Sequence, residues 1–350
     1  LIVKKNEIFT EFWETFQLDS ISGDWDFIEP ALFGYAAGQV IENFCRFNLS
    51  PRLNVIAHFH EWMTAAGILY LEKYAPHICT MFTTHATIVG RCTASNYQPL
   101  YQNLKDLNGF VKAHEFNVTA KHSLERIAAN VADTFTTVST ITAEECKYLL
   151  EKEVDIVTPN GFESDFVPRE KEFIEKRKQA RNKIFDVARA LTNQQYDEDT
   201  LIVINSGRYE FRNKGIDVFI DSIANIRNSK TVSKKIIALI TVPANHGGVR
   251  QDLLDKLNNK EKTDLPNPYL THNLHEFNYD QVVRKINERG LNTPGDVSII
   301  FIPCYLDEHD GLFNMEYYDL LIGADLTVFA SYYEPWGYTP LESLAFKIPT

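Results

Sequence analysis

The stretch LIVINSGRYEFRNKG, residues 201–215, decides the fold because it joins an apolar run to a glycine turn and two cations. The run Leu201–Asn205 has the length and the β-branched composition of a buried strand. Gly215 then opens a helix, and its apolar positions Ile216, Phe219, Ile220, Ile223 and Ile226 fall on one face. A strand, a turn and an amphipathic helix in this order are typical of a parallel α/β unit.

The same order recurs in both directions along the chain. Toward the C-terminus, further strands are expected at Lys235–Val242, Val297–Pro303 and Leu326–Ala330. Toward the N-terminus, strands are expected at Asn54–His60, Cys79–His85, Thr134–Ser139 and Ile156–Thr158. A helix is expected from His122, where Leu124, Ile127, Ala128 and Val131 share one face, and the charged stretch Glu170–Asp199 reads as a surface helix.

These runs form two consecutive sets, and a Pro-Asn-Gly turn at residues 159–161 separates them. We therefore expect an α/β protein with two Rossmann-like domains, each with a parallel sheet, that face a cleft. The expected domains are residues 1–160 and residues 161–350. No internal repeat stands out.

Composition excludes several classes of partner. A net charge of −12 and a pI near 5.4 argue against a nucleic-acid or anionic-membrane surface, since both favour clustered Lys and Arg. The five cysteines are widely spaced and form no C-x-x-C pair, so we expect core thiols rather than a disulfide framework or a zinc site. With no apolar run of transmembrane length and no signal-peptide pattern at Leu1, we expect a cytoplasmic protein.

Ligands of open α/β sheets bind beyond the carboxyl ends of the strands, so the polar residues after each strand are the candidate site. In the stretch after Asn205, Arg208, Lys214 and the positive end of the following helix suit a diphosphate. The alternative is that both are surface cations paired with Glu210 or Asp217.

The last strand leads into Glu334 and Glu342, with Pro335, Gly337 and Pro340 shaping the backbone between them. Carboxylates there can accept hydrogen bonds from sugar hydroxyls, and amides at the helix start can hold phosphate. The alternative for Glu342 is a helix carboxylate favoured by the macrodipole.

In the first half, a metal site is suggested by His58, His60 and Glu61. We reject this interpretation because no further ligand completes the site. Satisfied core histidines are the commoner interpretation. His85 has the same alternative, a buried imidazole bonded to the backbone.

Taken together, these stretches resemble glycogen synthase of the animal and fungal type, a retaining glycosyltransferase with the two-domain GT-B fold. The resemblance rests on runs that occur in family order, at residues 58–62, 83–91, 132–142, 159–161, 207–215 and 331–342. Glu334 to Glu342 resembles the E-x7-E motif of retaining GT-B enzymes. The surrounding sequence, Tyr-Tyr-Glu-Pro-Trp-Gly-Tyr-Thr-Pro, is specific to this family.

The resemblance implies transfer of glucose from UDP-glucose to the non-reducing end of an α-1,4-glucan, without a metal or another cofactor. Arg208 and Lys214 would neutralise the diphosphate, with Arg91 contributing from the other domain. The implied partners are UDP-glucose and the glucan, together with a possible homo-oligomer. The alternatives are another retaining GT-B transferase, or a non-catalytic module that binds a sugar nucleotide or a glucan.

The other implied roles concern the sugar and the nucleoside. His85 would lie beside the transferred glucose, Glu334 would hold its hydroxyls and Glu342 would hold the ribose. Tyr317, or its neighbour Tyr318, would stack on uracil. Further substrate or nucleotide contacts are implied for Asn160, Tyr338 and Thr339.

The sequence departs from the family pattern in two places. The family's Gly-Gly donor turn does not precede Leu1, and the chain stops at Thr350, so it resembles an internal segment lacking both ends. The stretch from Lys256 to Leu270 is short where animal and fungal members carry a long insertion with an arginine-rich regulatory helix. We therefore expect no activation by glucose-6-phosphate, and the family's tetramer is in doubt. A compact bacterial or protist-like member is the alternative to an internal segment.

Overall fold

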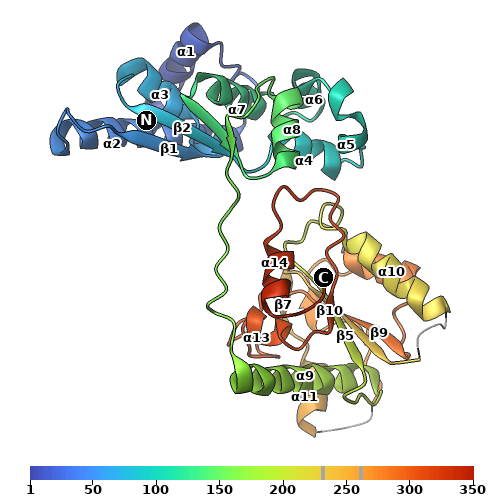
Figure 1. Cartoon of the computed structure of the whole chain (residues 1–350). Helices are drawn as coiled ribbons and strands as arrows, with labels where there is room; N and C mark the ends of the chain where they lie inside the picture. The colour runs from blue at the N-terminus through green and yellow to red at the C-terminus, as the bar shows by residue number, and fades with distance from the viewer. Residues whose placement is uncertain (230–232, 260–262) are drawn as a thin grey trace. The chain divides into compact units, whose positions relative to one another are not determined.

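The computed structural model describes residues 1–229, 233–259 and 263–350. The chain divides into two compact units, Leu1–Gly161 and Phe162–Thr350 (Figure 1). The division falls one residue after the boundary expected at residue 160.

The N-terminal unit is built on a parallel sheet whose strands lie in the order β1-β2-β3-β4. The strands are β1 (Ile56–His60), β2 (Cys79–Thr84), β3 (Thr134–Thr137) and β4 (Ile156–Val157). In the register, Phe59 pairs with Phe82 and Thr83 pairs with Thr136. The four strands expected in this half are confirmed, each one or two residues shorter than expected.

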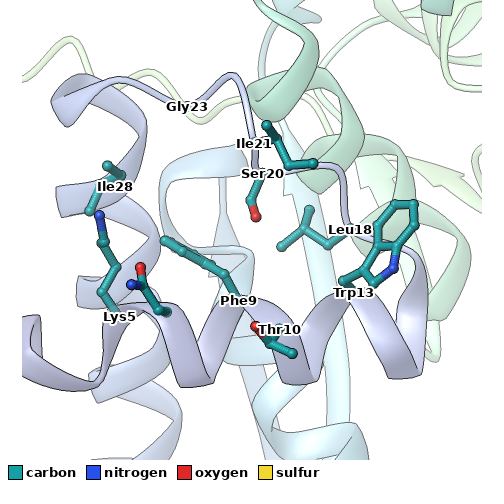
Figure 2. A pocket seen from close by; sticks show the side chains of 10 residues that line it. Lys5, Phe9, Thr10, Trp13, Leu18, Ser20, Ile21, Gly23 and Ile28 are labelled. Atoms are coloured by element: carbon teal, nitrogen blue, oxygen red, sulfur yellow. The ribbon is translucent and has the colours of Figure 1, made fainter.

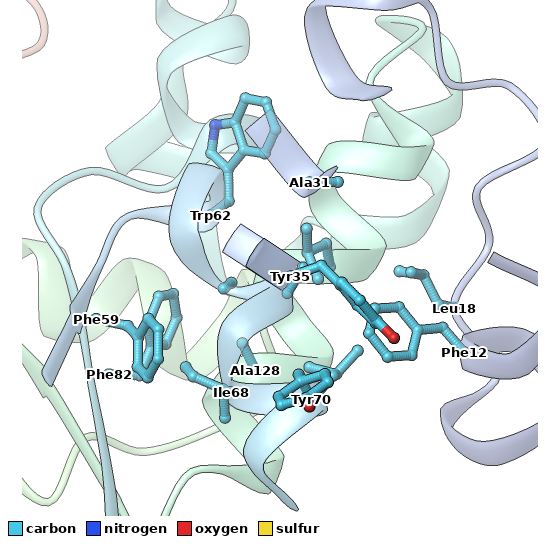
Figure 3. Packing of buried hydrophobic residues seen from close by; sticks show 14 of the residues in the cluster. Phe12, Leu18, Ala31, Tyr35, Phe59, Trp62, Ile68, Tyr70, Phe82 and Ala128 are labelled. Carbon is cyan, nitrogen blue, oxygen red and sulfur yellow. The ribbon is translucent and has the colours of Figure 1, made fainter. Parts of the chain in front are cut away.

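One face of this sheet carries the core of the unit. Its helices are α1 (Lys5–Phe16), α2 (Trp25–Asn48), α3 (Ala66–Tyr74), α4 (Ile88–Ser95), α5 (Leu100–Asn103), α6 (Gly109–Glu115), α7 (Thr119–Val131) and α8 (Thr140–Leu149). Apolar side chains of α1, α2, α3 and α7 pack together against Phe59, Phe82 and Phe135 of the strands (Figure 3). The face expected for α7 is confirmed, with Leu124 and Ala128 fully buried.

The other face of the strands is polar. Strand β1 alternates between the buried Ala57 and Phe59 and the exposed His58 and His60. The His58 ring bonds the Thr83 hydroxyl at 2.7 Å, and that hydroxyl lies 2.6 Å from the hydroxyl of Thr136.

The C-terminal unit has a second parallel sheet, in the order β10-β5-β6-β9. The strands are β5 (Leu201–Ser206), β6 (Ile236–Thr241), β9 (Val297–Ile302) and β10 (Leu326–Thr327), and they confirm the four expected in this half. Its helices are α9 (Glu170–Thr192), α10 (Ile216–Ser229), α11 (Gln251–Asn259), α12 (Gln281–Glu288), α13 (Tyr317–Leu321) and α14 (Tyr338–Ala345).

Apolar clusters cover both faces of this second sheet. Helix α9 packs on one face with Ile184, and α10 and α12 pack on the other with Phe219 and Ile286. The expectation of a surface helix at Glu170–Asp199 was therefore incomplete. Its charged residues surround a buried stripe that includes Ala180, Ile184 and Leu191, which recurs at helical spacing.

The sequence missed an antiparallel pair formed by β7 (His246–Val249) and β8 (His272–Leu274). The two strands flank the stretch from Lys256 to Leu270, where we expected the long insertion of the family to be absent. Residues 260–262 of that stretch lie outside the described residues.

Two expectations about chemistry can be compared with the fold. All five cysteines are free thiols, but only Cys146 and Cys304 are buried and Cys79 is exposed, so the core-thiol expectation holds in part. Among the described residues, no helix combines the length and the apolar character needed to cross a membrane.

Candidate functional site

The loop after β5 and the loop before α14 lie against each other at the carboxyl end of the C-terminal sheet. The Tyr332 amide donates to the Asn213 carbonyl at 2.9 Å. Gly215 has a φ of +60°, and a Cβ there would lie 1.7 Å from the carbonyl oxygen of Ala330. Only glycine permits the two backbone segments to lie this close. The need for glycine at Gly215 is therefore explained by backbone contact as well as by its turn.

Lys214 and Glu334 form an ion pair across the two loops. The Lys214 ammonium bonds Glu334 Oε2, and the Ser331 hydroxyl donates to the same oxygen at 3.2 Å. Their side chains are 16% and 25% exposed. Two residues predicted to contact different parts of one ligand therefore lie within hydrogen-bond distance of each other.

Arg208 stands apart from this pair, because its side chain is 68% exposed and its guanidinium lies 3.2 Å from Glu210. That contact matches one of the surface pairings considered as an alternative. The other is wrong: Asp217 is paired with Arg212 at 2.9 Å, and Lys214 bonds Glu334 instead.

The second carboxylate of the motif lies beside two tyrosines. The Tyr318 hydroxyl donates to Glu342 Oε1 at 2.9 Å, and burial raises the pKa of Glu342 above its ordinary value. Tyr317 shares a 2.7 Å hydrogen bond with the Ser206 hydroxyl at the end of β5. The Tyr318 ring is already stacked on Phe166 and Phe346, with centroids 4.6 and 5.7 Å away.

Tyr338 and Thr339 begin helix α14, next to this group. Tyr338 is 45% exposed and Thr339 is half-buried. The Trp336 indole N–H, in the loop before them, is buried and has no hydrogen-bond partner among the residues described. A donor of this kind is unusual in a folded protein, and nothing in the sequence pointed to it.

In the N-terminal unit, His85 follows β2 and is half-exposed. Its Nε2 lies 3.0 Å from Nδ1 of His60, and its backbone amide donates to Glu61 Oε1 at 2.9 Å. Burial, followed by the neighbouring His60 and His58, lowers the pKa of His85, so the imidazole is biased toward its neutral form. Glu61 has a φ of +64°, which is unusual for a residue with a side chain.

The interpretation of His58 and His60 as satisfied core histidines was wrong, since both are exposed. Their spacing of two puts both rings on the same face of β1, and their centroids lie 4.1 Å apart. Likewise, His85 is bonded to another imidazole rather than buried against the backbone. Across the described ranges, no cluster of three His, Cys, Asp or Glu side chains has an arrangement that could hold a metal.

Arg91 and Asn160 also belong to the N-terminal unit. Arg91 lies half-buried in α4, and Asn160 lies half-buried after β4. The structure thus brings together Lys214 with Glu334 and Tyr318 with Glu342 in one unit, and places His85, Arg91 and Asn160 in the other.

Sequence reasoning missed two fully buried carboxylates behind the His85 turn, Glu125 of α7 and Glu145 of α8. A faint signal existed for Glu125, because it directly follows Leu124 of the buried face. A hollow of about 390 Å³ between α1 and the start of α2, lined by Phe9, Trp13 and Ile21, holds none of the predicted residues (Figure 2).

Comparisons with known proteins cover almost the whole chain. The family model described as glycogen synthase matches residues 2–256 and 249–350. The chain is 32% identical over 407 residues to a glycogen [starch] synthase of Neurospora crassa, covering 99% of this chain and 57% of that protein. It is 30% identical over 409 residues to one of Caenorhabditis elegans, covering 99% of this chain and 61% of that protein. The chain therefore spans about three-fifths of the length of these relatives.

A solved structure shares the fold at much lower identity. The α,α-trehalose-phosphate synthase (UDP-forming) from Burkholderia xenovorans has a TM-score of 0.51 and 11% identity, over 91% of this chain and 61% of that one. With two parallel α/β sheets in the chain, this likeness confirms the GT-B fold class and carries nothing further.

Proposed function

Because this chain belongs to the glycogen synthase family, we propose that the natural protein transfers glucose from UDP-glucose to the non-reducing end of an α-1,4-glucan. The transfer retains the configuration of the anomeric carbon. A homo-oligomer stays a prediction from the family, and a cytoplasmic location stays a prediction from the sequence.

The observation that carries the proposal is the contact between the two motif loops of the C-terminal unit. Lys214 is assigned to the donor diphosphate and Glu334 to the hydroxyls of the donor glucose. Since their side chains bond each other, the two assignments require neighbouring parts of one ligand, as in a sugar attached to a diphosphate.

The charges suit the bond that breaks. As the bond between the anomeric carbon and the diphosphate oxygen lengthens, negative charge grows on the UDP and positive charge grows on the sugar ring. Arg208 and Lys214 stabilise the first charge, with Arg91 assigned the same role from its own unit. Glu334 stabilises the second charge.

We assign the nucleoside to Tyr317 and Glu342. Tyr317 is the better candidate for stacking on uracil, because the Tyr318 ring already packs on Phe166 and Phe346. Tyr318 instead orients Glu342, through its hydrogen bond, toward the ribose hydroxyls. Tyr338, Thr339 and Asn160 are assigned further substrate contacts.

Lys214 and Glu334 must exchange partners when the donor binds. The diphosphate replaces Glu334 as the anion beside Lys214, and the released carboxylate becomes available to the glucose hydroxyls. The ion pair in the free protein keeps each charge compensated until then.

The test is glucan elongation by the full-length natural protein with labelled UDP-glucose or ADP-glucose. Incorporation of label from UDP-glucose into α-1,4 linkages is the expected result. Preference for ADP-glucose would indicate another retaining GT-B transferase. Binding of UDP-glucose without incorporation would indicate a non-catalytic module.

A further inference from the structure

Three carboxylates from three different elements surround the segment between β2 and α4. They are Glu61 after β1, Glu125 of α7 and Glu145 of α8. The segment runs from Thr84 to Arg91 and carries His85 and Arg91, which the proposed function assigns to the sugar and the diphosphate. Each carboxylate accepts a hydrogen bond from a different part of it.

Glu125 holds the two ends of the turn. The Thr84 hydroxyl donates to one of its oxygens at 3.1 Å, and the Ile88 amide donates to the other at 3.2 Å. Glu125 is 0% exposed, and both of these donors are uncharged. Burial, followed by the nearby Glu61, raises the pKa of Glu125 to about 8.

Glu145 holds the start of α4. The Thr87 hydroxyl donates to Glu145 Oε2 at 2.6 Å and accepts from the Gly90 amide at 3.1 Å, so it links the carboxylate to the helix. The Tyr101 hydroxyl donates to the other oxygen at 3.0 Å. Gly90 packs so closely that a Cβ there would lie 2.3 Å from Glu145 Oε2.

This arrangement exceeds what capping a helix requires. One Thr side chain at the N-cap of α4 satisfies that need. Both carboxylates are fully buried, and the contacts fall at Thr84, His85, Thr87 and Ile88, which span the segment. The cluster therefore fixes the backbone on both sides of His85 and up to the start of the helix that carries Arg91.

We propose that Glu125 and Glu145 are positioning residues, which hold the segment Thr84–Arg91 so that His85 and Arg91 keep the orientation that glucosyl transfer needs. Neither carboxylate touches the substrate. The inference rests on the proposed function and adds to it two residues outside the family-like motifs.

The experiment compares kcat, the KM for UDP-glucose and Tm for Glu145→Gln, Thr87→Val and Thr87→Ser in the full-length natural protein. Misplacement of a catalytic group by about 1 Å can cost 10²-fold in rate, so Glu145→Gln and Thr87→Val are expected to lower kcat by about 10–100-fold. Thr87→Ser keeps the bridging hydroxyl and should restore most of the rate.

The matched control is Asp133→Asn. Asp133 accepts from the Thr80 amide and hydroxyl at the amino end of the same sheet, so this variant makes the same change from carboxylate to amide far from the turn. It should keep kcat even where Tm falls. Equal losses of kcat in Asp133→Asn and Glu145→Gln would overturn the inference in favour of a stability effect.

A double-mutant cycle separates positioning from an independent role. If Glu145 acts through His85 and Arg91, Glu145→Gln costs no further rate in a background that carries His85→Ala and Arg91→Ala. Full additivity of the two losses would overturn the inference.

A readout that needs no activity is the imidazole NMR signal of His85 in this chain. Glu145→Gln should shift it, and Asp133→Asn should not; an unmoved signal in Glu145→Gln contradicts the inference. A wild-type protein that fails to elongate glucan refutes the proposed function, while the His85 signal still decides whether Glu145 positions the turn.

Discussion

The two units hold their site residues in different ways. In the C-terminal unit, apolar side chains cover both faces of the sheet, and charged groups in the loops bond one another, as Lys214 bonds Glu334. In the N-terminal unit, the core lies on one face, and buried carboxylates hold the turn through hydroxyls and amides. Under the proposed function, the partners in the C-terminal unit are exchanged for a ligand, whereas those in the N-terminal unit stay fixed.

This difference predicts how substitutions act. Removing a charge in the C-terminal loops should alter ligand binding or the transition state directly, because the proposed function places the group itself against the ligand. Removing a carboxylate behind the His85 turn should alter activity indirectly, by changing the position of His85. The predictions below test this contrast.

The largest effect is expected for Glu334→Gln. The amide keeps the shape of the side chain and removes the charge that stabilises the developing sugar cation. A loss of about 10²–10³ in kcat is expected, the scale of one deleted preorganised contact. UDP affinity should stay nearly intact, because Lys214 is released from its ion pair and remains available to the diphosphate. Elongation rate and UDP binding are measured in parallel.

The control for that variant is Asp199→Asn, which removes a carboxylate paired with Lys234 at 3.3 Å in the same unit. It should leave kcat unchanged, since both residues precede strands at the opposite end of the sheet. A folded Glu334→Gln protein that elongates glucan at the wild-type rate would make the site assignment wrong.

By contrast, Glu342→Gln should raise the donor KM, because a ribose contact serves ground and transition states alike.

A stability effect of intermediate size is expected for Gly215→Ala. The φ of +60° disfavours a side chain, and the added Cβ would meet the Ala330 carbonyl at 1.7 Å. A strained backbone of this kind costs roughly 1–3 kcal/mol, which corresponds to a fall in Tm of about 2–12 °C for a unit of this size. Gly161→Ala is the control, because nothing lies within 4 Å of its Cβ position. Equal Tm values for the two variants would show that the loops do not pack as described.

A further effect is expected in the pH dependence of stability. Burial raises the pKa of Glu125 from 4.5 to about 8, so the folded protein keeps this proton at a pH where the unfolded chain loses it. The contribution of Glu125 to the free energy of unfolding is full at pH values below 4.5, falls as the pH rises, and is lost once the pH passes about 8. Glu125→Gln should flatten the fall in Tm between about pH 5 and pH 8. An unchanged slope would show that Glu125 is not held neutral.

Most of the fold could be predicted from the sequence. The strands are runs such as Leu201–Ser206 and Ile236–Thr241, which are buried on both faces and therefore read as continuous apolar segments. The pair β7 and β8 was not predicted because both strands are short and β7 contains Gly247 and Gly248, so neither alternation nor an apolar run marks it. Helix α9 was predicted to be a surface helix because its buried apolar stripe lies among many charged residues.

The candidate site could be predicted in part. Positions after strands pointed to Arg208, Lys214 and Glu334, because parallel strands end at one edge of a sheet. Sequence could not show that Lys214 bonds Glu334, since that contact joins residues 120 apart. The roles of the buried Glu125 and Glu145 could not be predicted for the same reason, because their partners come from other elements.

The measurement that tests the central claim most directly is calorimetric titration of UDP into this chain. We predict that the wild-type chain binds UDP and that Arg208→Ala and Lys214→Ala each weaken binding by roughly 1.5–3 kcal/mol. The Lys214→Ala loss should be the larger, because it leaves Glu334 unpaired beside the diphosphate. Lys234→Ala, which removes an exposed cation at the other end of the same sheet, should leave the affinity unchanged. Unchanged UDP affinity in both Arg208→Ala and Lys214→Ala would contradict a donor site at the carboxyl end of the C-terminal sheet.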